Sequence, residues 1–85
     1  MARYYFHSED GRRFPDDEGT ELPTLAAARI EAVRVLADIL REDPNEVLQN
    51  GNLRMTVTDE KGLIYFALDL AATDAAAGQA RRREG

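Results

Sequence analysis

The segment 24–42 constrains the fold most, because it is the only long stretch with an unbroken helical period. At about 100° per residue, apolar side chains gather on one side of a helical wheel and charged side chains on the other. The apolar side holds Leu25, Ala28, Ala32, Val33, Leu36, Ile39 and Leu40. This stripe is wide, so we expect the helix to lie against a sheet. Thr24 is the predicted N-cap, and Asp43-Pro44 ends the helix, since proline disfavours helical geometry in the residue before it.

The segment before this helix is predicted to form two strands. Residues 3–7 are rich in aromatic β-formers, and Asp10-Gly11 is a strong turn signal that lets residues 12–14 return as a short second strand. An acidic loop follows at residues 16–19. Residues 20–23 then lead into the helix.

The segment after the helix is predicted to form a single helical turn and a hairpin. Residues 43–46 have the form of a capping box and predict a turn that ends near Leu48. Apolar residues then alternate with polar ones from Leu53 to Thr58, which is the period of a half-buried strand. The turn at 59–62 leads into the most apolar strand, residues 63–70. Its expected inward side chains are Ile64, Phe66, Leu68 and Leu70.

These elements predict an α+β fold of order β-β-α-β-β, with one long helix on one face of a mostly antiparallel sheet. In this chain of 85 residues, we expect one domain at 1–72 and a flexible tail at 73–85 that includes Arg81-Arg82-Arg83. The chain has no cysteine, which excludes disulfides, a thiolate nucleophile and a cysteine zinc site. We expect a cytoplasmic protein without membrane contact, because no apolar run is long enough to span a bilayer and the start lacks the core of a signal peptide.

Arg29 stands out because it is a charged residue on the apolar side of the helix, where a bare charge is costly. It can extend past the edge of the sheet, or it can pair with the acidic loop through Asp16, Asp17 or Glu21. We favour the second arrangement, because a planar group with five donors suits several carboxylates at once. Arg29 is therefore predicted to be buried and to act as a structural clamp on the loop.

His7 and the acidic loop are the candidates for chemistry. His7 is the only histidine, and no serine or cysteine arrangement of the kind found in hydrolases accompanies it. The carboxylates of the loop could in principle collect a hard cation, but their spacing matches no EF-hand. We therefore expect a solvated acidic loop, no metal or other cofactor, and no enzyme activity. A metal or catalytic site at His7 and the loop stays as an alternative.

The face of the sheet opposite the helix is the better candidate for binding. If Tyr4 and Phe6 point inward, this open face carries Arg3, Tyr5, His7, Arg54 and Tyr65. Such side chains are typical of a protein interface, within a homodimer or with another protein, and also of a sheet that stacks RNA bases. The net charge of −5 and the lack of a glycine-aromatic RNA signature favour the protein interface over nucleic acid. A one-residue slip in the first strand would exchange its two faces.

Several of these motifs together resemble a family of short bacterial proteins classed as a domain of unknown function. The resemblance covers residues 3–70. It rests on the Tyr-Tyr-Phe-His opening at 4–7, Asp10-Gly11, the acidic loop through Leu22, the alanine-rich start of the helix at 26–32 and the turn at 59–62. It implies a bacterial cytoplasmic domain with no established activity.

The start of the helix is also similar to that of HicB-type antitoxin domains, which have a Thr-Leu-x-x-Ala pattern. Residues 24–28 match this pattern. A two-strand hairpin follows the helix here, in place of a DNA-binding segment, so this resemblance implies only a toxin-binding or partner-binding role. From the residues and the resemblances together, we expect a non-enzymatic module for protein interaction or regulation.

Overall fold

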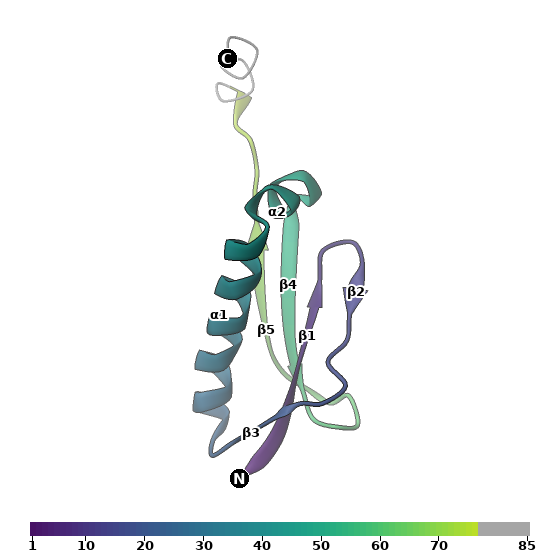
Figure 1. Ribbon diagram of the computed structural model, residues 1–85, viewed down its shortest axis with the longest axis vertical. Coiled ribbons are helices and arrows are strands. Elements are labelled where there is room, and N and C mark those ends of the chain that lie inside the picture. Colours follow the sequence, from purple (N-terminus) through teal and green to yellow (C-terminus); the bar gives the residue numbers. More distant parts are fainter. Residues whose placement is uncertain (77–85) are drawn as a thin grey trace.

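A helix lying against an antiparallel sheet makes two layers in the computed structural model, which describes residues 1–76 (Figure 1). The elements, in chain order, are β1 (Ala2–Glu9), β2 (Arg13–Phe14), β3 (Thr20–Leu22), α1 (Leu25–Glu42), α2 (Pro44–Asn50), β4 (Asn52–Thr58) and β5 (Ile64–Ala71). The predicted α+β fold is confirmed. The Arg81-Arg82-Arg83 run, which belongs to the predicted flexible tail, lies outside the described residues. No helix within residues 1–76 is long and apolar enough to cross a membrane.

Strands β1 and β4 form the middle of the sheet, and β5 pairs with the far side of β4. The other side of β1 is covered at both ends, by β2 at Ser8 and Glu9 and by β3 at residues 2–4. The sheet has one strand more than the predicted order β-β-α-β-β, because Thr20–Leu22 forms β3. A strand of three residues has too little periodicity to be recognised from sequence, and it exists here through its pairing with β1.

The core lies between α1 and the middle of the sheet. Its buried side chains are Tyr4, Phe6, Ala28, Ala32, Met55 and Val57. The small alanines at positions 28 and 32 are both fully buried, so the helix can approach the strands closely. The predicted inward direction of Tyr4, Phe6 and Met55 is therefore confirmed, and the face with Tyr5 and His7 is the open one.

The buried line of α1 is narrower than the predicted apolar stripe. Val35, Leu36 and Ile39 pack against the core, whereas 53% of Val33 and 38% of Leu25 are exposed. The prediction that Val33 faces the sheet is wrong, because the helix turns Val35 toward the strands and places Val33 on its flank.

A side chain caps the start of each helix, and a backbone hydrogen bond closes its end. The Thr24 hydroxyl accepts a hydrogen bond from the Ala27 amide at 3.0 Å, as predicted. Asp43 ends α1 and also caps α2, where its carboxylate accepts from the Glu46 amide at 3.2 Å. Helix α2 runs to Asn50, beyond the predicted end near Leu48. It stops at Gly51, which adopts a positive φ of 85° and donates to the Val47 carbonyl.

Replacing Thr24 by alanine is expected to lower the free energy of unfolding by about 1 kcal/mol, because the first turn of α1 loses its side-chain acceptor. Urea denaturation followed by circular dichroism measures the change. Thr24→Ser keeps the hydroxyl and should be close to the wild type. A loss in Thr24→Ser as large as in Thr24→Ala would contradict the role of the hydroxyl.

Candidate functional site

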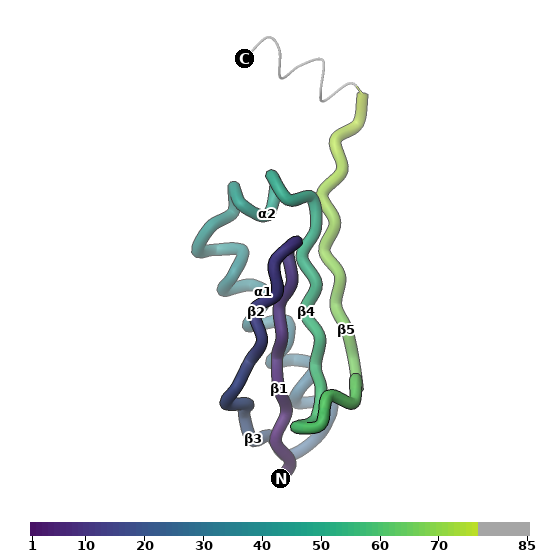
Figure 2. Tube along the Cα trace, turned by 90° about the vertical axis from the view of Figure 1, so that its right-hand side faces the viewer, coloured from purple at the N-terminus to yellow at the C-terminus, as the bar shows by residue number. Residues whose placement is uncertain are grey.

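The open face of the sheet has no helix over it (Figure 2). Side chains of β1, β4 and β5 that alternate away from the core form this face. A hollow of about 460 Å³ lies on it, lined among others by Tyr5, His7, Arg54, Thr56 and Ile64. The predicted interaction residues Tyr5, His7 and Arg54 therefore lie together.

His7 is held in place from both sides of its ring. Its Nδ1 accepts a hydrogen bond from the Asp16 amide at 3.0 Å. Its Nε2 lies 2.9 Å from the Thr58 hydroxyl, which itself donates to the Asp59 carbonyl. Because Nδ1 is an acceptor and the Thr58 proton is already used, Nε2 carries the proton and donates to Thr58. The ring of Tyr5 stacks on His7 with a centroid distance of 6.5 Å, so this pair has a fixed orientation.

Asp16 anchors the acidic loop to β1. Its carboxylate accepts hydrogen bonds from three backbone amides: Phe6 at 3.1 Å, Glu18 at 3.0 Å and Gly19 at 3.0 Å. Partial burial by itself raises the pKa of Asp16, but the bonds from Gly19, Phe6 and Glu18 outweigh it, so the net pKa lies below the ordinary value. The bond to Phe6 also satisfies an amide of β1 in the gap between β2 and β3.

Gly19 brings the acidic loop against the open-face side chains of β1. Its φ is +71°, and a Cβ built at this position would lie 2.8 Å from the Arg3 Cγ and 2.9 Å from the Tyr5 ring. Arg3 also donates to the Glu18 carbonyl at 2.7 Å and pairs with Glu21 at 3.5 Å. The loop therefore fixes the positions of Arg3 and Tyr5 at one side of the open face.

Arg54 and Asp69 form an ion pair across β4 and β5. Two parallel hydrogen bonds of 2.7 Å and 2.9 Å join the guanidinium to the carboxylate. The hydrogen bond raises the pKa of Arg54 and lowers that of Asp69, although both side chains are more than half exposed. An exposed pair of this kind contributes little stability, but the two bonds give the guanidinium a defined orientation.

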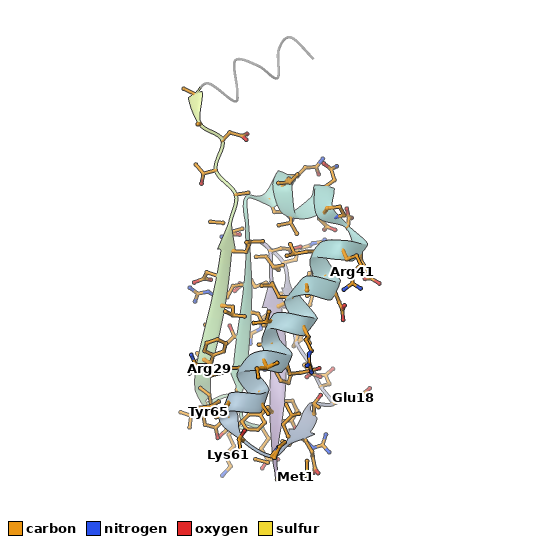
Figure 3. The ribbon with its side chains drawn as sticks, turned by 90° about the vertical axis from the view of Figure 1, so that its left-hand side faces the viewer. Met1, Glu18, Arg29, Arg41, Lys61 and Tyr65 are labelled. Carbon is orange, nitrogen blue, oxygen red and sulfur yellow. The ribbon has the colours of Figure 1, made fainter. Side chains whose placement is uncertain are left out.

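The predicted Arg29 clamp is wrong. Arg29 is exposed and its guanidinium lies over the Phe66 ring, 4.9 Å from the centroid. It makes no hydrogen bond or ion pair with any residue of the acidic loop. Figure 3 shows the physical reason: Arg29 lies on the flank of α1 toward β5, whereas Glu18 lies at the opposite side of the sheet.

None of the three carboxylates predicted to pair with Arg29 does so. Asp16 binds backbone amides, and Glu21 pairs with Arg3. Asp17 is exposed, and it makes no side-chain bond to the rest of residues 1–76.

The prediction that Tyr65 lies on the open face is wrong. Val57 of β4 pairs with Phe66 of β5, but the next residue, Thr58, pairs with Ile64. Tyr65 is therefore left as the extra residue of a β-bulge. Tyr65 then turns toward the helix side, where its ring packs on Tyr4 at 5.7 Å. The same shift moves Ile64 out of the core, in contrast to its predicted inward direction. Ile64 is 63% exposed and lines the hollow.

Sequence reasoning missed the bonds that order the open face. The signal for Asp16 was the pattern Asp-x-x-Gly after a proline, in which a carboxylate commonly binds amides two or three residues on. The Arg54–Asp69 pair could have been found by aligning the two strands of the hairpin. Within residues 1–76, no three side chains of the types that bind metals gather as a metal ion would require.

The chain matches the model of one protein family. The family is described as "Domain of unknown function (DUF6894)", and the match covers residues 3–72. The chain belongs to this family. The matched span runs from β1 through β5 and includes the open face, and the predicted resemblance to a domain of unknown function is confirmed. No curated protein and no solved structure matches the chain. The likeness to HicB-type antitoxins stays a prediction.

Proposed function

We propose that this domain is a non-enzymatic protein-interaction module and that the open face of its sheet is the binding surface. The observation that carries the proposal is the hollow itself, in which ordered side chains from β1, β4 and β5 surround a space that no helix covers. Tyrosine and arginine are enriched where proteins bind each other. Tyr5 and Arg54 provide both at this face.

The side chains of the open face are ordered before any partner arrives. Tyr5 stacks on His7, His7 is bonded on both ring nitrogens, and Arg54 is oriented by two bonds to Asp69. A surface whose side chains are already fixed loses less conformational entropy on binding. This order supports a binding role for the face.

The hydrogen bonds of His7 favour binding over catalysis. A general base needs a free lone pair, and Nδ1 already accepts from the Asp16 amide. A general acid needs an available proton, and the proton on Nε2 is directed at Thr58. Either role would require His7 to give up a bond that holds the acidic loop or β4.

The ion pairs of the open face favour a protein over a nucleic acid as the partner. Binding to phosphates requires cations that are free to neutralise them. Here Arg54 is paired with Asp69, and Arg3 is paired with Glu21. Arg13 also lines the hollow, together with the carboxylates of Glu9 and Asp59. The cytoplasmic location of the protein stays a prediction of the sequence.

Photo-cross-linking in the protein's own cells tests this proposal. A photoreactive amino acid in place of Thr56, at the centre of the open face, is expected to give a discrete covalent adduct with another polypeptide. The control has the same amino acid in place of Arg34, an exposed residue on α1, and should give no such adduct. Absence of an adduct from Thr56, or equal adducts from both positions, would contradict a binding role for this face.

A further inference from the structure

Strand β5 leaves one edge of the sheet bare. Among residues 1–76 its only strand partner is β4, and nothing lies beside its other edge in Figure 2. Natural edge strands are commonly protected by lysine, proline or a covering segment. The sequence of β5 has neither lysine nor proline, and its only protection is the bulge at the hairpin end. The opposite edge, at β1, is by contrast covered by β2, β3 and the Asp16 carboxylate.

The backbone pattern shows which groups of β5 are free. The Ala72 amide donates to the Gly51 carbonyl, and the pairing continues in register with Leu53 opposite Leu70. Hydrogen-bonded and non-hydrogen-bonded pairs alternate in an antiparallel ladder. Residues 66, 68 and 70 therefore bond to β4, whereas the N–H and C=O groups of Ala67, Asp69 and Ala71 point toward the bare edge.

Helix α1 adds an exposed apolar stripe above this edge. The stripe has the spacing i, i+4, i+7, i+11, i+14 and consists of the exposed Ala26, Ile30, Val33 and Ala37 and the half-buried Leu40. Ile30 and Val33 are each more than half exposed. The contact of Arg29 with Phe66 shows that this flank of α1 is the one toward β5 (Figure 3). The ion pairs Glu31–Arg34 and Asp38–Arg41 lie on the other flank.

We propose that a second copy of this chain occupies this face, with the two β5 strands paired antiparallel across a two-fold axis. Charge supports this occupant. Each chain has a net charge of −5, so two copies repel least where the surfaces that meet carry no unpaired carboxylate. Asp69 is the only carboxylate of β5 and is paired with Arg54, and the Arg29 guanidinium over Phe66 adds positive charge to this flank.

The charges also select the register of the pairing. Pairing centred on Leu68 sets Asp69 opposite Ala67 of the second copy and aligns the apolar side chains of the helix side. Pairing centred on Asp69 would bring the two Asp69 carboxylates face to face, which is unfavourable. Pairing centred on Ala67 would set Asp69 opposite the bulged Tyr65. The register centred on Leu68 is therefore the expected one.

The size of the face fits a dimer. Helix α1 has 18 residues and is about 27 Å long. The helix layer and the sheet layer together are about 20 Å high at this edge. The product of this length and this height is a flat area of roughly 500 Å². Surface relief raises this toward the ~600 Å² per partner of the smaller stable interfaces. The two β4 strands would stand three strand spacings, or about 14 Å, apart. Val33 and Leu40 from both copies would fill the space between the helices.

The oligomeric mass tests the interface. Sedimentation equilibrium at micromolar concentration is expected to give two chains of 9.5 kDa for the wild type. Ala67→Pro removes an amide that points to the bare edge and spares the bonds to β4, so it should give one chain. Glu60→Pro, in the turn of the same hairpin, should leave two. Circular dichroism verifies that each variant is folded. A wild type of one chain, or a folded Ala67→Pro variant of two, would overturn the proposal.

A cysteine cross-link tests the register. The chain has no cysteine of its own, so a single introduced thiol reports only on contact between copies. In the proposed register Leu68 faces Leu68 of the second copy as a non-hydrogen-bonded pair, with Cα atoms about 4.5 Å apart, which suits a disulfide. Leu68→Cys should become a covalent dimer under mild oxidation. Leu70→Cys should not, because Leu70 of one copy lies opposite Phe66 of the other, four residues along the strand from the second Leu70. Equal dimer from both, or dimer from Leu70→Cys alone, would contradict the register.

This dimer is independent of the proposed binding role of the open face, because the two use different surfaces. Thr56 lies on β4, away from the β5 edge. If a photoreactive residue at position 56 gives no adduct, the proposed binding role of the open face fails, whereas sedimentation equilibrium would still give two chains. If both proposals hold, the two open faces form one continuous sheet surface with two binding sites.

Discussion

Replacing Asp16 by alanine is expected to lower the free energy of unfolding by about 2 kcal/mol, because three backbone amides lose their charged acceptor at once. Hydrogen bonds to a charged group are worth more than neutral ones, but Asp16 is only half-buried and solvent weakens each of them. Urea denaturation at neutral pH measures the loss. Asp17→Ala is the matched control, since this exposed neighbour makes no such bond, and its effect should stay within about 0.5 kcal/mol. Equal effects of the two substitutions would contradict the anchoring role of Asp16.

The pH dependence of stability gives a second measurement on Asp16. Its pKa is lower in the folded chain than the ordinary value of 3.8, so the unfolded chain binds a proton first as the pH falls. The contribution of Asp16 is therefore complete above pH 3.8 and is lost as the pH falls through the lower pKa of the folded chain. Asp16→Asn should lose less stability than the wild type between pH 5 and the acid limit of folding. An unchanged acid slope in Asp16→Asn would contradict the lowered pKa.

Replacing Gly19 by alanine is expected to cost about 2 to 3 kcal/mol. A positive φ costs a residue with a Cβ about 1 kcal/mol, and the crowding against Arg3, Tyr5 and the Tyr4 carbonyl adds a further 1 to 2 kcal/mol. Gly62→Ala separates the two causes, since Gly62 also has a positive φ, of 90°, but no atom within 4 Å of the added Cβ. Its cost should be about 1 kcal/mol. Thermal and urea unfolding compare the two variants, and equal costs would show that Gly19 is not crowded by β1.

The layers of this fold follow from patterns that can be recognised in the sequence. Alternation from Leu53 to Val57 sets the buried face of β4, and the aromatic residues of β1 then settle which face is open. Thr24 and Asp43 cap helices because their side chains act on amides within three residues. Local interactions of this kind depend on sequence spacing alone, so they could be predicted.

The candidate site depends on contacts that sequence spacing does not determine. A helical wheel gives the direction of the Arg29 side chain around α1, but not the side of the sheet along which the acidic loop runs. For this reason the prediction that Arg29 pairs with the loop is wrong. Asp16 fits the local pattern of a carboxylate that binds amides two or three residues on, but its bond to the Phe6 amide depends on the path of the loop past β1. The bulge that moves Tyr65 to the helix side likewise arises from the pairing of β4 with β5.

Native mass spectrometry of the untagged protein, released gently from its own cells, tests the binding role of the open face most directly. We expect the wild type to carry a second kind of polypeptide, and Thr56→Arg, which fills the hollow at its centre, to lose it while remaining folded. The matched substitution Arg34→Ala on α1 should keep it. A wild type that carries nucleic acid, or only further copies of itself, would contradict the proposal, and so would a bound polypeptide that Thr56→Arg retains.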